Sequence, residues 1–213
     1  MMKEFHKRHL PHIQPLGGTF FVTYVLKGSL PKEVAAQWRI EYDMQKEHIL
    51  KNSTNIKVEL EKFGKLEFAK RDKFFDSYSG GNHYFKLENL AQIVVDSLHY
   101  WDNKRLELYA YTIMSNHVHA VFRLFDEHEI LKPVYLEQIM HSIKLFSATE
   151  CNKALGLKGT FWQDESYDRL VRNNEELRRI LIYVLNNPVK AGLCSKMSDW
   201  KWSYIKSDYN DIM

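Results

Sequence analysis

The chain has 213 residues, enough for one domain with a substantial core, and its 45% hydrophobic and 27% charged residues are typical of a globular protein. No apolar run approaches the length of a membrane span, and the polar N-terminus lacks the apolar core of a signal peptide, so we expect a cytoplasmic protein with no membrane partner. A net charge of +3 is too small to indicate nucleic-acid binding by itself, and two cysteines without metal-ligand spacing predict reduced thiols.

The first half of the chain alternates strand and helix signals. In order, we predict a strand at 20–26, a helix from Pro31 to about Leu50, helix or loop at 56–76, and a helix at 87–101. The strand is rich in β-branched and aromatic residues, and a proline with acid nearby is typical of a first helical turn. The last of these helices carries apolar residues at spacings of three and four, which give it one apolar face.

The second half continues the pattern. We predict strands within 106–124, a helix at 134–154, short strands at 161–163 and 167–172, and a helix opened by Asn173. Residues 106–124 are either two strands joined by Ser115-Asn116 or one long bent strand. The apolar face of the 134–154 helix comprises Leu136, Ile139, Met140, Ile143 and Phe146, and Gly156 ends that helix. We expect Pro188 to end the last helix, because it disfavours helical geometry at Asn187. Neighbouring strand pairs favour an α+β fold on an antiparallel sheet.

His117-Val118-His119 lies inside this apolar, β-rich stretch. Successive strand side chains point to opposite faces, so the two imidazoles share one face and can reach one metal ion. Such a pair is a moderate signal in a chain with 10 histidines, and a purely structural role stays open. A metal site would need a third ligand, and imidazole with oxygen ligands suits Mn, Mg or Zn.

Tyr183 and Asn187 form a second polar pair. They are four residues apart on an otherwise apolar helix, so they point together and need polar partners. The alternative is a tyrosine with its hydroxyl at the edge of the core and an asparagine capping the end of the helix.

These features together resemble a known family. Segments 111–119, 161–172 and 183–192 are similar to those of the REP-associated tyrosine transposases, which belong to the single-tyrosine transposases with a His-hydrophobic-His motif. The resemblance covers residues 8–30 and about 100–206. It implies a ferredoxin-like antiparallel sheet packed by helices, the His-hydrophobic-His nuclease fold. We therefore expect one transposase-like domain over 1–213, with a helical insertion at 32–100.

The resemblance also implies roles for the two polar pairs. His117 and His119 would bind a divalent metal, Mg or Mn, and Tyr183 would be the nucleophile. Asn187 matches the position of the third metal ligand, where relatives often carry the longer Gln. Relatives commonly have Pro where this chain has Ser115, a change that should not touch the metal.

The expected partner is single-stranded or hairpin DNA. Cations crowd the segments beside Tyr183, and phosphate contacts or a solvated helix face are the two interpretations of them. The predicted DNA-binding residues are Arg169, Arg172, Arg178, Arg179 and Lys190, together with Arg8, His12 and Gln14 near the N-terminus. Both a monomer and a homodimer remain open.

The function implied is a single-stranded DNA endonuclease and strand transferase that cuts and rejoins DNA next to hairpin-forming repeats. It would form a 5′-phosphotyrosine link and release a 3′-hydroxyl, with no nucleotide cofactor. One alternative is a domesticated protein that binds hairpin repeats without cutting. Another is a zinc hydrolase that uses the histidine pair with a further His, Asp or Glu ligand.

Overall fold

The computed structural model describes residues 5–7, 11–13, 15–78, 80–164 and 166–213. The chain divides into two compact units, one made of residues 1–26 and 83–213 and the other of residues 27–82. In none of the described helices does an apolar stretch reach the length that a bilayer crossing needs.

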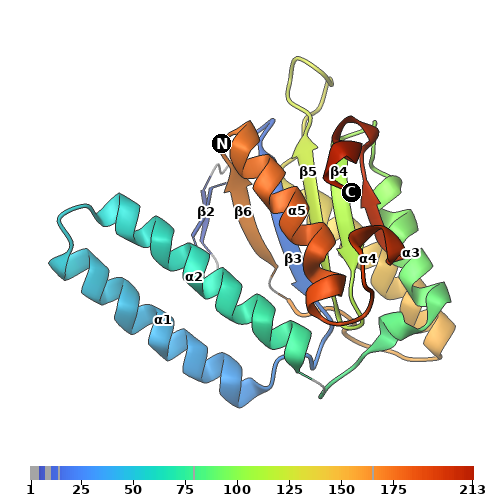
Figure 1. The fold of residues 1–213 in the computed structure, drawn as a ribbon, viewed down its shortest axis with the longest axis horizontal. Coiled ribbons are helices and arrows are strands. Elements are labelled where there is room, and N and C mark those ends of the chain that lie inside the picture. The colour runs from blue at the N-terminus through green and yellow to red at the C-terminus, as the bar shows by residue number, and fades with distance from the viewer. Residues whose placement is uncertain (1–4, 8–10, 14, 79, 165) are drawn as a thin grey trace. The chain divides into compact units, whose positions relative to one another are not determined.

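A five-stranded antiparallel sheet is the centre of the first unit (Figure 1). Its strands are β3 (Thr19–Val25), β4 (Leu106–Ile113), β5 (His117–Leu124), β6 (Tyr167–Val171) and β7 (Ser203–Ile205). The spatial order is β6-β3-β5-β4-β7. The tight turn at Ser115-Asn116 joins β4 to β5 and is closed by the Met114 N–H, which donates to the His117 carbonyl over 2.9 Å. Of the two arrangements expected for residues 106–124, the pair of strands is therefore the correct one.

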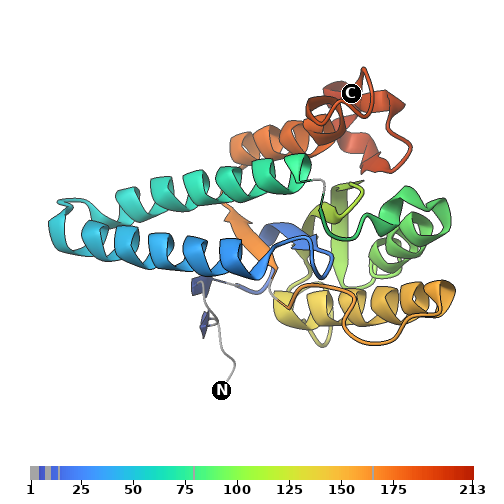
Figure 2. The same ribbon diagram turned by 90° about the horizontal axis from the view of Figure 1, so that it is seen from below.

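Three helices accompany this sheet: α3 (Glu88–His99), α4 (Leu136–Leu155) and α5 (Asn174–Lys190). Figure 2 shows α3 and α4 on one side of the sheet and α5 on the other. Within the first unit, the first four strands of this sheet and two of these helices follow one another as β3-α3-β4-β5-α4-β6, with β6 beside β3 and β5 between β3 and β4. This is the ferredoxin-like βαββαβ topology. The α+β fold with an antiparallel sheet is thus confirmed.

Local sequence signals set the ends of two of these helices. The Asn173 side chain accepts a hydrogen bond from the Glu176 N–H over 2.8 Å, which satisfies one of the donors at the start of α5. Gly156 ends α4 at a φ of 66°, in the left-handed region where glycine has no steric cost. Both ends agree with the sequence prediction.

The two faces of the sheet differ in chemistry. Val118 lies opposite Tyr24 on β3 and Ile113 on β4, and all three belong to the apolar core that also contains residues of α3 and α4. His119 lies opposite Thr23 and Thr112, so the polar row is on the other face of the same three strands. That second face is the one on which α5 packs.

A β-bulge interrupts the pairing of β4 with β5. Leu108 pairs with Phe122, and Ala110 pairs with Val121, so Tyr109 is an extra residue on β4. Beyond the bulge, Thr112 lies on the face of the histidines.

The second unit is a helical hairpin of α1 (Lys32–Asn52) and α2 (Ile56–Ser77), which run side by side (Figures 1 and 2). Aromatic pairs join the two helices: Trp38 meets Phe74 edge-on at 5.1 Å between ring centroids. Segment 56–76, expected as helix or loop, is helix. At the base of the hairpin, Gly81 has a φ of 81°, and a Cβ there would lie 2.5 Å from the Gly28 carbonyl oxygen, so no larger residue fits.

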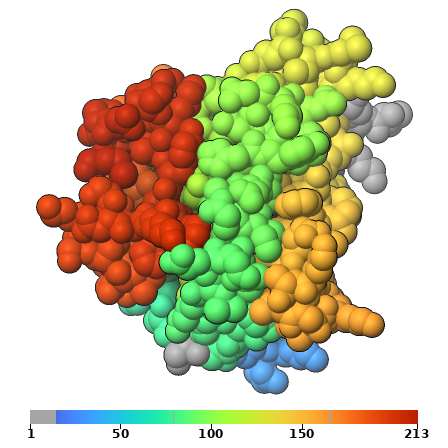
Figure 3. Space-filling view, turned by 90° about the vertical axis from the view of Figure 1, so that its right-hand side faces the viewer, coloured from blue at the N-terminus to red at the C-terminus, as the bar shows by residue number. Residues whose placement is uncertain are grey.

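Short elements complete the first unit. They are the strands β1 (Phe5–Lys7) and β2 (Pro11–Ile13), which pair with each other, and the 3-10 turns η1 (Tyr84–Lys86), η2 (Met197–Asp199) and η3 (Ser207–Ile212). The C-terminal segment lies against the surface formed by α3 and β4, as Figure 3 shows in red beside green. The Trp200 indole N–H donates to the Ile113 carbonyl over 3.1 Å, and Lys201 pairs with Glu88 at 2.7 Å.

Several sequence predictions require correction. Pro188 does not end α5: Asn187 and Pro188 are both buried inside the helix, which continues to Lys190. Burial of this last turn outweighs the local preference of a residue before proline. Residues 161–163 form an isolated bridge, Leu26 to Trp162, rather than a strand. Phe146, predicted on the apolar face of α4, is 52% exposed. The expected helical insertion at 32–100 includes α3, but α3 packs against α4 and belongs to the first unit. The second unit ends at residue 82.

Candidate active site

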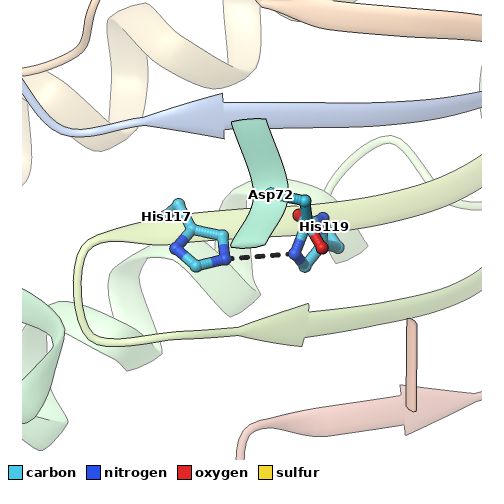
Figure 4. Close-up of side chains that lie close together, drawn as sticks. All are labelled: Asp72, His117 and His119. Atoms are coloured by element: carbon cyan, nitrogen blue, oxygen red, sulfur yellow. Dashed lines mark hydrogen bonds between the residues drawn. The ribbon is translucent and has the colours of Figure 1, made fainter. Parts of the chain in front are cut away.

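The centre of the site is the histidine pair at the start of β5. Strand alternation places both imidazoles on the face opposite Val118, and neither side chain has exposed surface. Their Nε2 atoms face each other at 3.1 Å, as the dashed line in Figure 4 marks. The Nε2 atoms of the two rings therefore point toward the same position between them.

The Nδ1 atom of each imidazole has its own hydrogen-bond partner. Nδ1 of His117 lies 2.7 Å from Oδ1 of Asn116, and Nδ1 of His119 lies 2.7 Å from the hydroxyl of Thr23. Both partners are themselves buried. Each ring is thus held at the nitrogen that points away from the other ring.

Helix α5 brings Tyr183 to the same face. The Tyr183 ring meets the His119 imidazole at 6.3 Å between centroids and 75° between planes. Phe21, on β3, contacts both rings, at 6.0 Å from Tyr183 and 5.8 Å from His119. The ammonium of Lys190 lies 4.3 Å from the centroid of the Tyr183 ring. A phenol, two imidazoles and a cation therefore gather at one place in the first unit.

Asn187 follows Tyr183 by one helical turn. Its Nδ2 donates to the Tyr183 carbonyl over 3.0 Å, which leaves Oδ1 buried without a hydrogen-bond partner. A buried carbonyl oxygen without a partner costs about 1–3 kcal/mol, so such atoms call for an explanation. An ion bound to Oδ1 would be such an explanation.

The donor set fits a divalent metal. Two nitrogen ligands bound to one ion at about 2.1 Å lie about 3 Å apart when they are neighbours in its coordination sphere. The separation of 3.1 Å between the Nε2 atoms meets this requirement. An amide oxygen such as Oδ1 of Asn187 is an ordinary ligand for Mg²⁺ and Mn²⁺.

Two other tyrosines on the strands are unsuited to nucleophilic attack. Tyr24 and Tyr111 point to the apolar face. Burial raises the pKa of Tyr111 to about 12, with smaller contributions from the charges of Tyr204 and Asp96. Burial also raises the pKa of Tyr24 well above its usual value. Because the phenolate is the better nucleophile, these two hydroxyls are poor candidates.

The cations predicted to bind DNA have several environments. Arg169 pairs with the buried Glu176, Arg178 pairs with Asp211, and Arg179 pairs with Glu175 at 2.9 Å. Arg172 is exposed, and its backbone N–H donates to Glu176 over 2.9 Å. Lys190 is exposed beside Tyr183. Arg8 and Gln14 lie outside the described residues, and His12 belongs to β2.

Sequence reasoning missed Thr23 and Asn116, the two partners of the imidazoles. Asn116 could have been found, because it directly precedes His117 in a tight turn. Thr23 could not, since nothing in the sequence sets the register that brings β3 opposite His119.

Comparisons with known proteins relate the chain to transposases. Residues 87–187 match the family model described as "Transposase IS200 like". A REP-associated tyrosine transposase of Escherichia coli (strain K12) is 26% identical over 106 residues, which are 50% of this chain and 58% of that protein. A relative from Haemophilus influenzae, provisionally named in the same group, is 25% identical over 109 residues and matched over 60% of its length. The chain thus spans a little over half the length of these curated relatives.

One solved structure in this group is also similar. A REP-associated tyrosine transposase bound to a REP hairpin is 18% identical, with a TM-score of 0.48 over 95% of this chain and 82% of that one.

Proposed function

Because its sequence is related to the IS200-like and REP-associated tyrosine transposases, we propose that this chain is a metal-dependent, single-strand DNA endonuclease and strand transferase with Tyr183 as its nucleophile. The observation that carries the proposal is the position of the Tyr183 ring, 6.3 Å from the imidazole of His119 on the polar face of the sheet. Its substrate is single-stranded DNA beside hairpin-forming repeats.

His117, His119 and Asn187 hold the ion in this proposal. Two Nε2 atoms at 3.1 Å and a buried Oδ1 without a partner support that assignment. Mg²⁺ or Mn²⁺ bound there would withdraw negative charge from the oxygens of the scissile phosphate and stabilise the charge that builds up during attack.

Tyr183 attacks the phosphorus atom with its phenolic oxygen. An unperturbed phenol has a pKa of about 10, so its proton must leave as the new bond forms. The P–O3′ bond breaks, and the released 3′-oxygen takes up a proton. The product is a 5′-phosphotyrosine link that keeps the energy of the phosphodiester, so another 3′-hydroxyl can reverse the step and join the strands. Packing against Phe21 restricts the ring and favours in-line attack.

Lys190 and Arg172 are the strongest candidates for phosphate contacts. Both are exposed, and Lys190 already lies against the ring of the proposed nucleophile. The ion pairs of Arg178 and Arg179 are exposed as well. Exposed pairs are worth about 1 kcal/mol or less, so these arginines can exchange a carboxylate for a phosphate at little cost.

A covalent adduct is the direct test of the proposal. Single-stranded oligonucleotides that carry the inverted repeats found beside the gene, labelled on the 3′ side of the hairpin, are mixed with the full chain and Mn²⁺. We expect a labelled protein band that survives denaturing electrophoresis. Tyr183→Phe should abolish this band and leave DNA affinity within a few-fold.

Tyr111→Phe is the matched control, because it removes a hydroxyl from the opposite face of the sheet. It should form the adduct at the level of the unchanged protein. If Tyr183→Phe still forms the adduct, the mechanism is wrong. If the unchanged chain binds hairpins without forming an adduct under any ion, the chain is a hairpin-binding protein instead.

A further inference from the structure

We propose that the two ends of the first unit from which the helical hairpin leaves hold the turn between β4 and β5, with His83 as the positioning residue. These ends are Leu26, directly before the second unit, and the segment from His83 to Phe85, directly after it. A change at the base of the hairpin would then reach His117, which follows the turn. The inference rests on the proposed function only where it concerns ion binding, because its first step concerns hydrogen bonds within the first unit.

The segment that follows the hairpin holds Ser115, the first residue of the turn. Nδ1 of His83 lies 2.9 Å from the Ser115 hydroxyl, and the Phe85 N–H donates to the Ser115 carbonyl over 3.1 Å. Phe85 is itself fixed, because its buried ring meets Phe161 edge-on in the apolar core. Ser115 is therefore held through its side chain and through its backbone by one short segment.

The segment that precedes the hairpin holds Asn116, the second residue of the turn. The Leu26 N–H donates to the Asn116 carbonyl over 2.9 Å. Leu26 is fully buried and forms an isolated bridge with Trp162, so its own backbone has a fixed place. The two residues of the turn are thus bonded to opposite ends of the break in the first unit.

Within the second unit, the base of the hairpin ties these two segments to each other. Nδ2 of Asn82 donates to the Lys27 carbonyl over 3.1 Å. Gly81 approaches Gly28 so closely that a Cβ on Gly81 would lie 2.5 Å from the Gly28 carbonyl oxygen. Because Lys27 and Asn82 are joined by peptide bonds to the residues that hold the turn, the spacing at the hairpin base constrains the turn as well.

The backbone of the turn sets the place of the His117 imidazole. The Met114 N–H closes the turn on the His117 carbonyl over 2.9 Å, and Oδ1 of Asn116 lies 2.7 Å from Nδ1 of His117. A rotation of the Asn116 backbone would therefore carry this ring away from His119. In the proposed function an ion needs both rings in place, so its affinity should depend on how firmly the turn is held.

The first measurement is amide hydrogen exchange by NMR, in the full chain without ion or DNA. The amides of Leu26 and Phe85, here called the turn-holding amides, donate the two backbone bonds to the turn. His83→Ala removes the bond to the Ser115 hydroxyl, so the Phe85 amide should exchange about 10-fold faster. Ser115→Ala should do the same, and the double variant should be no faster than either single one.

Two further variants control this measurement. Ser115→Thr keeps a hydroxyl and should restore slow exchange. His99→Ala removes another contact between an imidazole and a hydroxyl in the first unit, that of His99 Nε2 with Tyr111 at 3.3 Å. It should leave both turn-holding amides unchanged.

The second measurement asks whether the base of the hairpin acts on the turn. Asn82→Ala breaks the bond to the Lys27 carbonyl, so the turn-holding amides should exchange a few-fold faster and Mn²⁺ affinity, by titration calorimetry, should fall a few-fold. Asn52→Ala is the matched control, because Nδ2 of Asn52 donates to the His48 carbonyl over 3.0 Å at the end of α1. It should leave both properties unchanged.

Each outcome decides a separate part. An unchanged Phe85 amide in His83→Ala, or the same change in His99→Ala, overturns the role of His83. Equal effects of Asn82→Ala and Asn52→Ala, or none of Asn82→Ala, overturn the coupling to the hairpin. A chain that binds no Mn²⁺ while its turn-holding amides respond as expected contradicts the proposed function alone.

Discussion

The two faces of the five-stranded sheet use the same strands for different tasks. Toward α3 and α4, Tyr24, Val118 and Ile113 form an apolar row across three strands, and all three are buried. Toward α5, the row one residue along is Thr23, His119 and Thr112. Alternate residues therefore serve stability and the proposed chemistry, and a shift of one residue in register would exchange the two faces.

The polar row is held by hydrogen bonds because it gains little from the hydrophobic effect. Burying a polar group without a partner costs about 1–3 kcal/mol. Thr23 meets His119, and Thr112 meets Ser203, so these hydroxyls avoid that cost. The comparison teaches that a site can be fully buried and stay stable, provided that each polar atom is paired or bound to an ion.

Removing an imidazole should have the largest effect on the polar face. In His119→Ala, the ion loses one of its two nitrogen ligands, so we expect adduct formation and Mn²⁺ binding to fall below detection. A cooperative unfolding transition should remain, because the opposite face is untouched. Denaturing electrophoresis, calorimetry and circular dichroism measure the three properties. If His119→Ala still cleaved DNA, the polar face of the sheet would not be the site of the chemistry.

Phe122→Ala tests the apolar face. Phe122 is fully buried, and its removal should lower the free energy of unfolding by about 3–5 kcal/mol, from lost burial and the cavity left behind. Guanidinium unfolding measures the change. The neighbouring Val121→Ala, on the other face, removes fewer carbon atoms and should cost less. At a temperature where Phe122→Ala is folded, its adduct yield should equal that of the unchanged chain.

Asn187→Ala sharpens the comparison at the proposed third ligand. The variant removes the buried Oδ1 and the hydrogen bond to the Tyr183 carbonyl. We expect Mn²⁺ affinity to fall about 10-fold and stability to change by about 1 kcal/mol or less, because the loss of one bond is offset by the loss of an unpaired oxygen. An unchanged affinity would remove Asn187 from the ligand set.

The smallest expected effect concerns the thiol on the apolar side. Burial raises the pKa of Cys151 to about 12, with a smaller contribution from Glu150. A thiol with a raised pKa contributes stability below its unfolded value of about 9. That contribution is lost as pH rises through the interval from about 9 to about 12.

At pH 8.5, iodoacetamide should therefore modify the partly exposed Cys194 well before Cys151. Mass spectrometry of the digested protein measures both rates. Equal rates would mean that water reaches the interior of this face in the folded chain.

Patterns of short range predicted much of this fold. The alternation around Val118 correctly placed both histidines on one face, and Asn173 and Gly156 marked helix ends that the structure confirms. These signals depend on the chemistry of neighbouring residues, which the sequence displays directly.

What escaped prediction depends on partners distant in the chain. Thr23 and His119 are 96 residues apart, and only the register of β3 with β5 brings them together. Pro188 was predicted to end its helix, but its burial in the last turn of α5 decides otherwise. Phe146 follows the apolar period of α4 and is nevertheless exposed, because periodicity does not tell where a neighbouring element ends.

The extra residue at Tyr109 has a consequence for how this strand tolerates change in length. Because the bulge exchanges the two faces, Ala110 and Thr112 point toward α5 while Leu108, two residues earlier, points toward the core. Deleting that one residue would leave Leu108 opposite Phe122 and the next residue, Ala110, opposite Val121, so the ladder would become regular and every downstream side chain would keep its direction. Pairing Tyr109 into the ladder opposite Val121 would instead turn Thr112 toward the apolar core and Ile113 toward α5. Lineages of this protein should therefore accept the loss of residue 109 more readily than a regular strand that retains it.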